Sequence, residues 1–308
     1  MFPFLIKKAF FDMWDNLFRI FALNLGYVLI ISGTGFLLSA VPQAQLAYFA
    51  VLVIGSAALS VFTMGTAAIV SELADYKTPE WRIFLDAIRA RWLPAVLLVV
   101  INAAVFLFLL VIAVPVYTQS TIGLVALGLL GWAAVFWLLS LQAFFPLTTR
   151  MGDPFGKTLR KCFTLLFDNT GFTVGLFIAL NVSAPYLLGL FLLLFLGAPT
   201  RMLAFGSPML LLPGPASAVL LLTVAFKLRM YKYDFLEERQ QASADQTSAD
   251  QTSADQTSAD QEGTDEGQVE QAGGKRRRVR IPWDALLAED REQVGVRTLR
   301  GMIFPWKE

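Results

Sequence analysis

Six apolar segments of this 308-residue chain, each 18 residues or longer, contain no aspartate, glutamate, lysine or arginine. A helix that crosses a hydrocarbon layer of about 30 Å needs roughly 20 apolar residues. Strands of a membrane barrel alternate polar and apolar residues over shorter segments, so a barrel is excluded. We therefore predict an all-α polytopic membrane protein with six transmembrane helices, over residues 20–40, 46–71, 93–117, 122–145, 172–196 and 209–226.

The first apolar stretch has one alternative interpretation, a cleaved signal peptide, because small residues surround the segment LLSAVPQA. Its apolar length exceeds the roughly 7–15 residues of a signal core, and a long amphipathic segment precedes it. We expect an uncleaved first transmembrane helix.

Positive charges alternate between the two sides of the predicted spans. The segment before span one, the connection between spans two and three, and the connection between spans four and five hold three, four and four lysines and arginines. The tail after span six holds thirteen more, whereas the three remaining connections hold only Arg201. Because short loops rich in lysine and arginine stay in the cytoplasm, we expect a multi-pass protein with both termini cytoplasmic.

A charged and aromatic decamer occurs twice, each time directly before a predicted span. KKAFFDMWDN at residues 7–16 returns as RKCFTLLFDN at 160–169, and a weaker copy, FLDAIRARW, lies at 84–92. If the decamer forms a helix, its aromatic residues lie on one face. We expect such a helix to lie along the headgroup boundary of the membrane, with Lys7 and Lys8 near lipid phosphates. The chain thus reads as three hairpin units, each led by an amphipathic surface helix. The alternative to internal repetition is that the copies arose independently, because any cytoplasmic segment that enters a membrane favours aromatic and basic residues.

Few polar side chains lie within the predicted spans. Aligning the second and third copies of the repeat also aligns Asn102 of span three with Asn181 of span five, and span one contains Asn24. These amides could line a substrate path, or they could form interhelical hydrogen bonds of about 0.6 kcal/mol each. We favour interhelical contacts.

Several kinds of chemistry are excluded by composition. The chain has one cysteine and no histidine, which rules out an internal disulfide, haem held by histidine, His-containing zinc sites and a Ser–His–Asp triad. No carboxylate, lysine, arginine or histidine lies within a span, and no phosphate-binding Walker motif occurs. A divalent-ion site could be formed by four acidic residues, Glu72, Asp75, Glu80 and Asp86. Because basic residues alternate with them, we favour a solvated loop whose charges neutralise one another. We predict no enzyme activity, catalytic residue, metal or cofactor.

The composition changes abruptly after the transmembrane domain, residues 1–232. The motif SADQ occurs four times between Ser243 and Gln261, and too few apolar residues are present to form a core, so residues 233–274 are predicted to be a disordered linker.

A basic cluster begins the C-terminal segment, residues 275–308, and consists of Lys275, Arg276, Arg277, Arg278 and Arg280. We expect this cluster to bind membrane lipid or a protein partner rather than nucleic acid. The alternative is a run of charges exposed to solvent. The last residues are apolar for a free end, so we expect Phe304 and Trp306 to dock on the cytoplasmic helices or at the interface.

Four segments carry a resemblance to a known family: KKAFFDMWDNLFRIFALNLGYVL from residue 7, TMGTAAIVSEL from residue 63, RIFLDAIRARWLPA from residue 82 and FPLTTRMGDPFGKTLRKCF from residue 145. They resemble the YesL-like family of bacterial integral membrane proteins, a family of unknown function, over roughly residues 5–230. The resemblance implies a protein of the bacterial cytoplasmic membrane, with members often encoded beside carbohydrate uptake systems. It supplies no catalytic residues, and the repeat tail departs from the compact form of the family.

Two functional hypotheses follow. The first is a non-enzymatic accessory or permease-like component linked to the transport of small solutes, with carbohydrates as candidates. The chain lacks the Glu-Ala-Ala motif that docks an ATPase, which favours an accessory component over a permease. The second is a membrane scaffold whose cytoplasmic tail recruits a protein partner.

Overall fold

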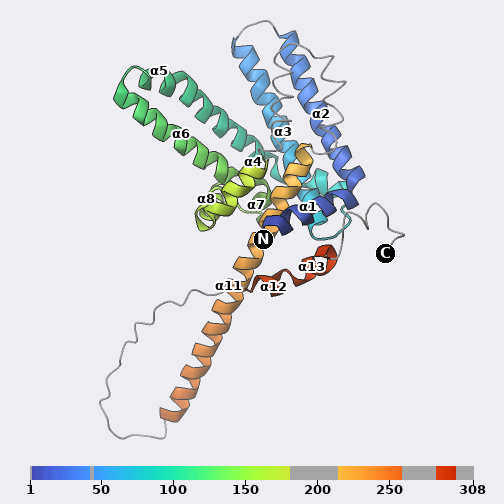
Figure 1. Ribbon diagram of the computed structural model, residues 1–308, viewed down its shortest axis with the longest axis vertical. Helices are drawn as coiled ribbons and strands as arrows, with labels where there is room; N and C mark the ends of the chain where they lie inside the picture. The colour runs from blue at the N-terminus through green and yellow to red at the C-terminus, as the bar shows by residue number, and fades with distance from the viewer. Residues whose placement is uncertain (1, 42–44, 181–213, 259–281, 296–308) are drawn as a thin grey trace. The chain divides into compact units, whose positions relative to one another are not determined.

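The computed structural model describes residues 2–41, 45–180, 214–258 and 282–295, and the regular structure within these ranges is helical (Figure 1). The chain divides into two compact units, Met1–Phe226 and Lys227–Glu308. The described elements are, in chain order, α1 (Phe2–Asp15), α2 (Leu17–Ala40), α3 (Gln45–Ala74), α4 (Trp81–Leu107), the π-helical turn η1 (Phe108–Ala113), α5 (Val114–Tyr117), α6 (Thr121–Leu141), α7 (Phe144–Met151), α8 (Phe155–Asp168), α11 (Pro215–Ser258), α12 (Trp283–Leu286) and α13 (Ala288–Gly295).

Four helical stretches of the first unit are long and apolar enough to cross a membrane: Leu17–Ala40, Leu46–Ala74, Trp81–Tyr117 and Thr121–Met151. They coincide with the first four predicted spans, so the prediction of an all-α, multi-pass membrane protein is confirmed. A fifth candidate is α8 taken together with the helix Thr170–Leu180, which meet at a bend of 101°. The remainder of predicted span five and the start of span six lie outside the described residues, and the total of six stays a prediction.

Aromatic rings join α2, α3 and α4, of which α2 and α3 run side by side (Figure 1). Phe62 of α3 lies edge-on to Tyr27 of α2, with centroids 4.8 Å apart, and edge-on to Phe84 of α4 at 5.2 Å. Such pairs add about 0.5–1.5 kcal/mol each beyond burial. A Cβ atom at Gly26 would overlap the ring of Phe62, and one at Gly65 would overlap Phe84, so both glycines permit the close approach.

The repeated decamer ends where a helix breaks. Between α1 and α2, the side-chain Nδ2 of Asn16 donates a hydrogen bond to the carbonyl of Asp12 at 3.1 Å. Between α8 and the next helix, the side-chain Oδ1 of Asn169 accepts from the amide of Phe172 at 3.4 Å. Asparagine competes with the helix for backbone hydrogen bonds and so favours such breaks. The Asp-Asn pair that closes both copies therefore marks the passage from the amphipathic helix to the apolar helix that follows.

The third copy of the repeat behaves differently. No Asp-Asn pair follows FLDAIRARW, and α4 continues through it without a break from Trp81 to Leu107. The prediction of a separate surface helix before span three is therefore not met: residues 84–92 form the first turns of the spanning helix itself.

The longest helix, α11, has 44 residues and begins at Pro215. Proline suits the first helical position, where no backbone donor is needed. No glycine or proline follows before Gly263, and α11 continues to Ser258, into the segment whose composition predicts a disordered linker. On a helix of 3.6 residues per turn, each five-residue repeat advances by about 140°, so the SADQT repeats form no continuous apolar face.

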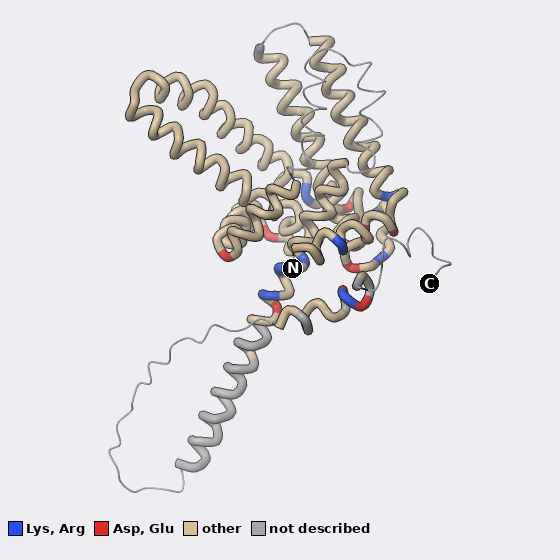
Figure 2. The backbone as a smooth tube through the Cα atoms, in the orientation of Figure 1, with Lys and Arg blue, Asp and Glu red and all other residues tan. Residues whose placement is uncertain are grey.

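Charged side chains of the first unit gather at one end of its apolar helices, which we call the charged end (Figure 2). It comprises α1, the turn after α3, the first turns of α4, and α7 with α8. The hydrocarbon layer explains this segregation, since an ionised side chain within it costs several kcal/mol.

Candidate functional site: the polar network at the charged end

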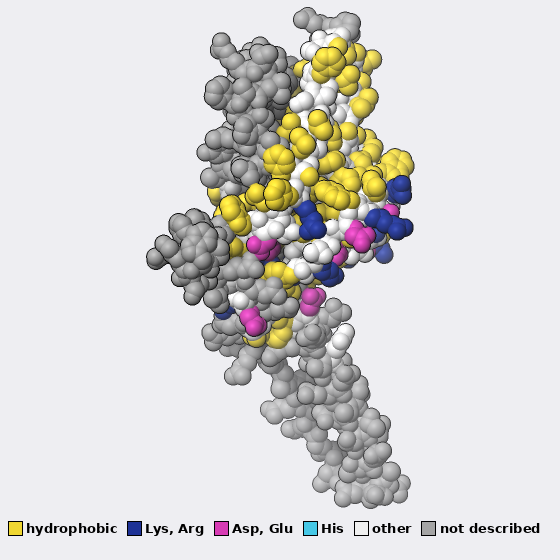
Figure 3. All heavy atoms as spheres, turned by 90° about the vertical axis from the view of Figure 1, so that its right-hand side faces the viewer, with side chains coloured by type: hydrophobic (Ala, Val, Ile, Leu, Met, Phe, Trp, Pro, Cys, Tyr) yellow, Lys and Arg dark blue, Asp and Glu magenta, His cyan; other side chains and the backbone are white. Residues whose placement is uncertain are grey.

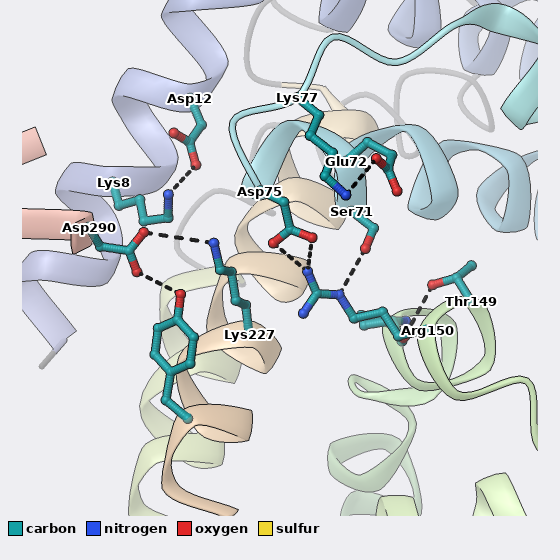
Figure 4. A network of polar contacts seen from close by, with 12 residues as sticks. Lys8, Asp12, Ser71, Glu72, Asp75, Lys77, Thr149, Arg150, Lys227 and Asp290 are labelled. Carbon is teal, nitrogen blue, oxygen red and sulfur yellow. Dashed lines mark hydrogen bonds and ion pairs between the residues drawn. The ribbon is translucent and has the colours of Figure 1, made fainter. Parts of the chain in front are cut away.

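The turn that ends α3 is the centre of a polar network (Figure 4). The amide of Tyr76 donates to the carbonyl of Leu73, and the amide of Lys77 donates to that of Glu72, both at 3.0 Å. Tyr76 adopts a left-handed backbone conformation with φ 58°, which costs about 1–2 kcal/mol in a residue other than glycine. This turn holds Asp75 and Tyr76 where two other helices contact them.

Arg150 of α7 binds the end of α3 through its guanidinium group. Its Nη2 donates to both carboxylate oxygens of Asp75 at 2.6 Å, and its Nε donates to Ser71 Oγ at 2.9 Å. The side chains of Arg150 and Asp75 are 24% and 30% exposed. Charge-assisted hydrogen bonds with this degree of burial are stronger than surface ion pairs, so this contact fixes α7 against α3.

Lys8 of α1 is the second contact to this turn, and it is fully buried. Its Nζ lies 3.3 Å from Asp12 Oδ2 and 3.7 Å from the centroid of the Tyr76 ring. A carboxylate and an aromatic face together replace the water that a lysine loses on burial. The sequence places Lys8 near lipid phosphates, and this prediction is wrong because Lys8 lies on a buried stretch of α1 together with Leu5, Ala9, Phe11 and Asp12.

The charges of this network are paired with one another, which is typical of a structural contact between helices. We call this network the inter-helix contact. Asp75 pairs with Arg150, and Glu72 lies 3.5 Å from Lys77. Within the described ranges, no three histidine, cysteine, aspartate or glutamate side chains form a group that could hold a metal ion. The network therefore joins α1, α3 and α7 at the charged end.

Two of the amides singled out from the sequence form contacts between helices. Asn102 of α4 accepts a hydrogen bond from Trp137 Nε1 of α6 at 2.8 Å, and its Nδ2 donates to the carbonyl of Leu98 at 2.9 Å. Asn24 of α2 is completely buried, and its Oδ1 accepts from the amide of Ala216 at 2.8 Å, at the start of α11. The other residues predicted from the sequence lie outside the described residues: Asn181, Lys275, Arg276, Arg277, Arg278, Arg280, Phe304 and Trp306.

We expect Asn102 and Trp137 to be energetically coupled. In a double-mutant cycle with Asn102→Leu and Trp137→Phe, the coupling energy should be about 0.6 kcal/mol and at most about 1.7 kcal/mol, as for other interhelical bonds in lipid. Unfolding of each variant in detergent gives this value. Trp132→Phe is the matched control, since Trp132 is exposed on the same helix and should show no coupling to Asn102.

The chain's one cysteine should be shielded from reagents. Cys162 of α8 is buried, with 1% of its surface exposed. Maleimide should therefore label the folded protein at least about tenfold more slowly than a Cys162→Ala/Thr164→Cys variant, whose thiol stands at an exposed position two residues away. Labelling at equal rates would show that α8 does not pack as described.

The second unit contains a separate buried contact that the sequence did not reveal. Asp290 of α13 is 2% exposed, its Oδ2 accepts a hydrogen bond from the Tyr231 hydroxyl at 3.2 Å, and its Oδ1 lies 3.8 Å from Lys227 Nζ. Leu287 and Val294 are buried as well. Their i, i+7 spacing is the one sequence signal that could have indicated this docked segment.

The described charged contacts hold helices together within each unit: Arg150 with Asp75 and Lys8 with the Tyr76 ring in the first, and Asp290 with Lys227 in the second. None of them presents an activated nucleophile. Comparison with known proteins adds no assignment: no family model, no curated protein and no solved structure matches this chain.

Proposed function

We propose that this protein is a non-enzymatic accessory subunit of a membrane system that transports small solutes, with carbohydrates as the candidate class. One observation carries the accessory role: the amides of Asn24 and Asn102, which could have lined a solute path, are bonded to neighbouring helices. A groove between α2, α3 and α4 is lined by apolar side chains and offers a sugar no hydrogen-bonding partner. Bonded amides and an apolar groove suit a protein that supports a carrier.

The link to transport rests on the resemblance to the YesL-like membrane proteins rather than on the site. We infer six spans with the charged end in the cytoplasm, because lysine and arginine are concentrated there. The inter-helix contact that joins α1, α3 and α7 would then lie on the cytoplasmic side, where the ATPases and regulators of transport systems act.

Deleting the gene and measuring uptake over a panel of labelled sugars tests this function. We expect reduced uptake of one or a few related sugars, restored by the complete gene. Unchanged uptake of every sugar, with the protein present in wild-type membranes, would count against the proposal.

A second candidate function is a scaffold whose C-terminal segment recruits a cytoplasmic protein. The contact of Asp290 with Lys227 and Tyr231 supports it, since this contact holds α13 to α11 and gives the tail a defined structure. Removing residues 234–308 distinguishes the two functions. A scaffold loses its function although the remaining protein still inserts, whereas an accessory subunit acting through its spans retains function.

A further inference from the structure

An open apolar groove lies between α2, α3 and α4. Its volume is about 470 Å³, and its lining includes Ile30 of α2, Ile54, Ala58 and Phe62 of α3, and Ile88 and Val96 of α4. Almost all of its accessible lining is apolar. A groove of this chemistry on a membrane-spanning unit accepts a hydrocarbon chain.

The same stretch of α4 carries exposed cations. Ile88, which lines the groove, is followed by Arg89, whose side chain is 79% exposed, and Arg82 two turns earlier is 83% exposed. Their contacts with Asp86 measure 3.8 and 4.0 Å, which is longer than a hydrogen bond. Both guanidinium groups therefore retain donors for another anion.

Tryptophans complete the pattern expected at a headgroup boundary. Trp81 and Trp92 are about half exposed, and on a helix they share a face with Ile88 because residues 81, 88 and 92 fall within about 40° of one another. Indole rings concentrate where hydrocarbon meets headgroups. Figure 3 shows how charged side chains border a hydrophobic surface on one face of the molecule.

We propose that this groove binds an acyl chain of an anionic phospholipid whose phosphate is held by Arg82 and Arg89. The apolar lining supplies the site for the tail, and the arginines select a headgroup with net negative charge over a zwitterionic one. A second copy of the chain suits the groove less well, since a symmetric contact would bring the arginines of both copies together. The lipid comes from the leaflet at the charged end.

The test is native mass spectrometry of the full chain, purified in detergent and incubated with vesicles of equimolar dioleoylphosphatidylglycerol and dioleoylphosphatidylcholine. We expect one phosphatidylglycerol to be retained in clear excess over phosphatidylcholine. Arg82→Gln and Arg89→Gln should each lower the ratio of the two retained lipids about fivefold. Arg160→Gln, which removes the same charge from an exposed position of α8, should leave the ratio unchanged.

A second pair of variants tests the tail site. Ala58→Trp fills the groove from an exposed position and should abolish retention of the tightly held lipid, whereas Ala133→Trp at an exposed position of α6 should not. Helicity measured by circular dichroism verifies that each variant is folded. Equal retention of both lipids by the wild type, or an unchanged ratio in Arg82→Gln/Arg89→Gln, would overturn the proposal. A dimer that Ala58→Trp dissociates without changing lipid retention would also overturn it, because the occupant would then be a second copy.

Discussion

Replacing Lys8 with methionine is expected to lower the free energy of unfolding by about 3–5 kcal/mol, the largest effect we anticipate for a single substitution. Lys8 is fully buried and lies 3.3 Å from Asp12, which is 4% exposed. Methionine preserves most of the volume but removes the positive charge, so the Asp12 carboxylate loses this cation at a site that water does not reach. Thermal unfolding in detergent should show a fall in Tm of roughly 10 °C.

The matched control is the double variant Lys8→Met/Asp12→Leu, in which both charges are replaced by apolar groups. Because the cost of the single change comes from removing the cation beside a buried carboxylate, the double variant, which removes the carboxylate as well, should recover most of the lost stability. If Lys8→Met left Tm within about 1 °C of the wild type, the burial of this pair against Tyr76 would be contradicted.

Asp75→Asn should cost about 1.5–3 kcal/mol, the usual contribution of hydrogen bonds to charged groups. The change removes the negative charge that receives two contacts from Arg150 Nη2 and leaves the part-buried guanidinium with weaker acceptors. Since Arg150 also donates to Ser71, α7 should loosen from α3 without complete loss of the fold. The measurement is again Tm in detergent, with a fall of roughly 5 °C expected.

Asp86→Asn is the control for Asp75→Asn, because it removes the same charge from the same end of the helices. Asp86 is 58% exposed, and its ion pairs with Arg82 and Arg89 are 3.8 and 4.0 Å long. Exposed pairs of this kind contribute about 0.2–1 kcal/mol, so the effect on Tm should be small. Equal effects of the two substitutions would show that the contact between Asp75 and Arg150 adds no more stability than a surface pair.

The Asp-Asn pairs at the ends of both decamers show how far the sequence alone predicts local structure. Their recurrence before spans one and five indicates a repeated unit, and the structure adds the role of Asn16 and Asn169 as the points where the helix breaks. The weaker copy at residues 84–92 lacks this pair, and there the helix continues. In these copies, the helix breaks where an asparagine side chain bonds to the nearby backbone, and it continues where the asparagine is absent.

The residues of the candidate site were much less predictable. Lys8 stands beside Lys7 in an amphipathic segment, and its i, i+4 spacing to Asp12 indicates an ion pair on one helix but not that the pair is buried. Arg150 and Asp75 are 75 positions apart, and each belongs to a segment of mixed charge in which solvation is the simpler interpretation. Asp290 lies within a charged run and is nevertheless buried.

The sequence by itself determined that this is an all-α, multi-pass membrane protein with its charges at the ends of the helices, because the thickness of the hydrocarbon layer and the cost of placing charge in it act on each segment separately. Only the tertiary structure decided which charges are withdrawn from water and what they contact on other elements: Lys8 is buried against the Tyr76 ring, and part-buried Asp75 pairs with Arg150. Burial of a charge depends on partners that approach from other helices, and the packing that brings those helices together is not encoded in the periodicity of any one of them.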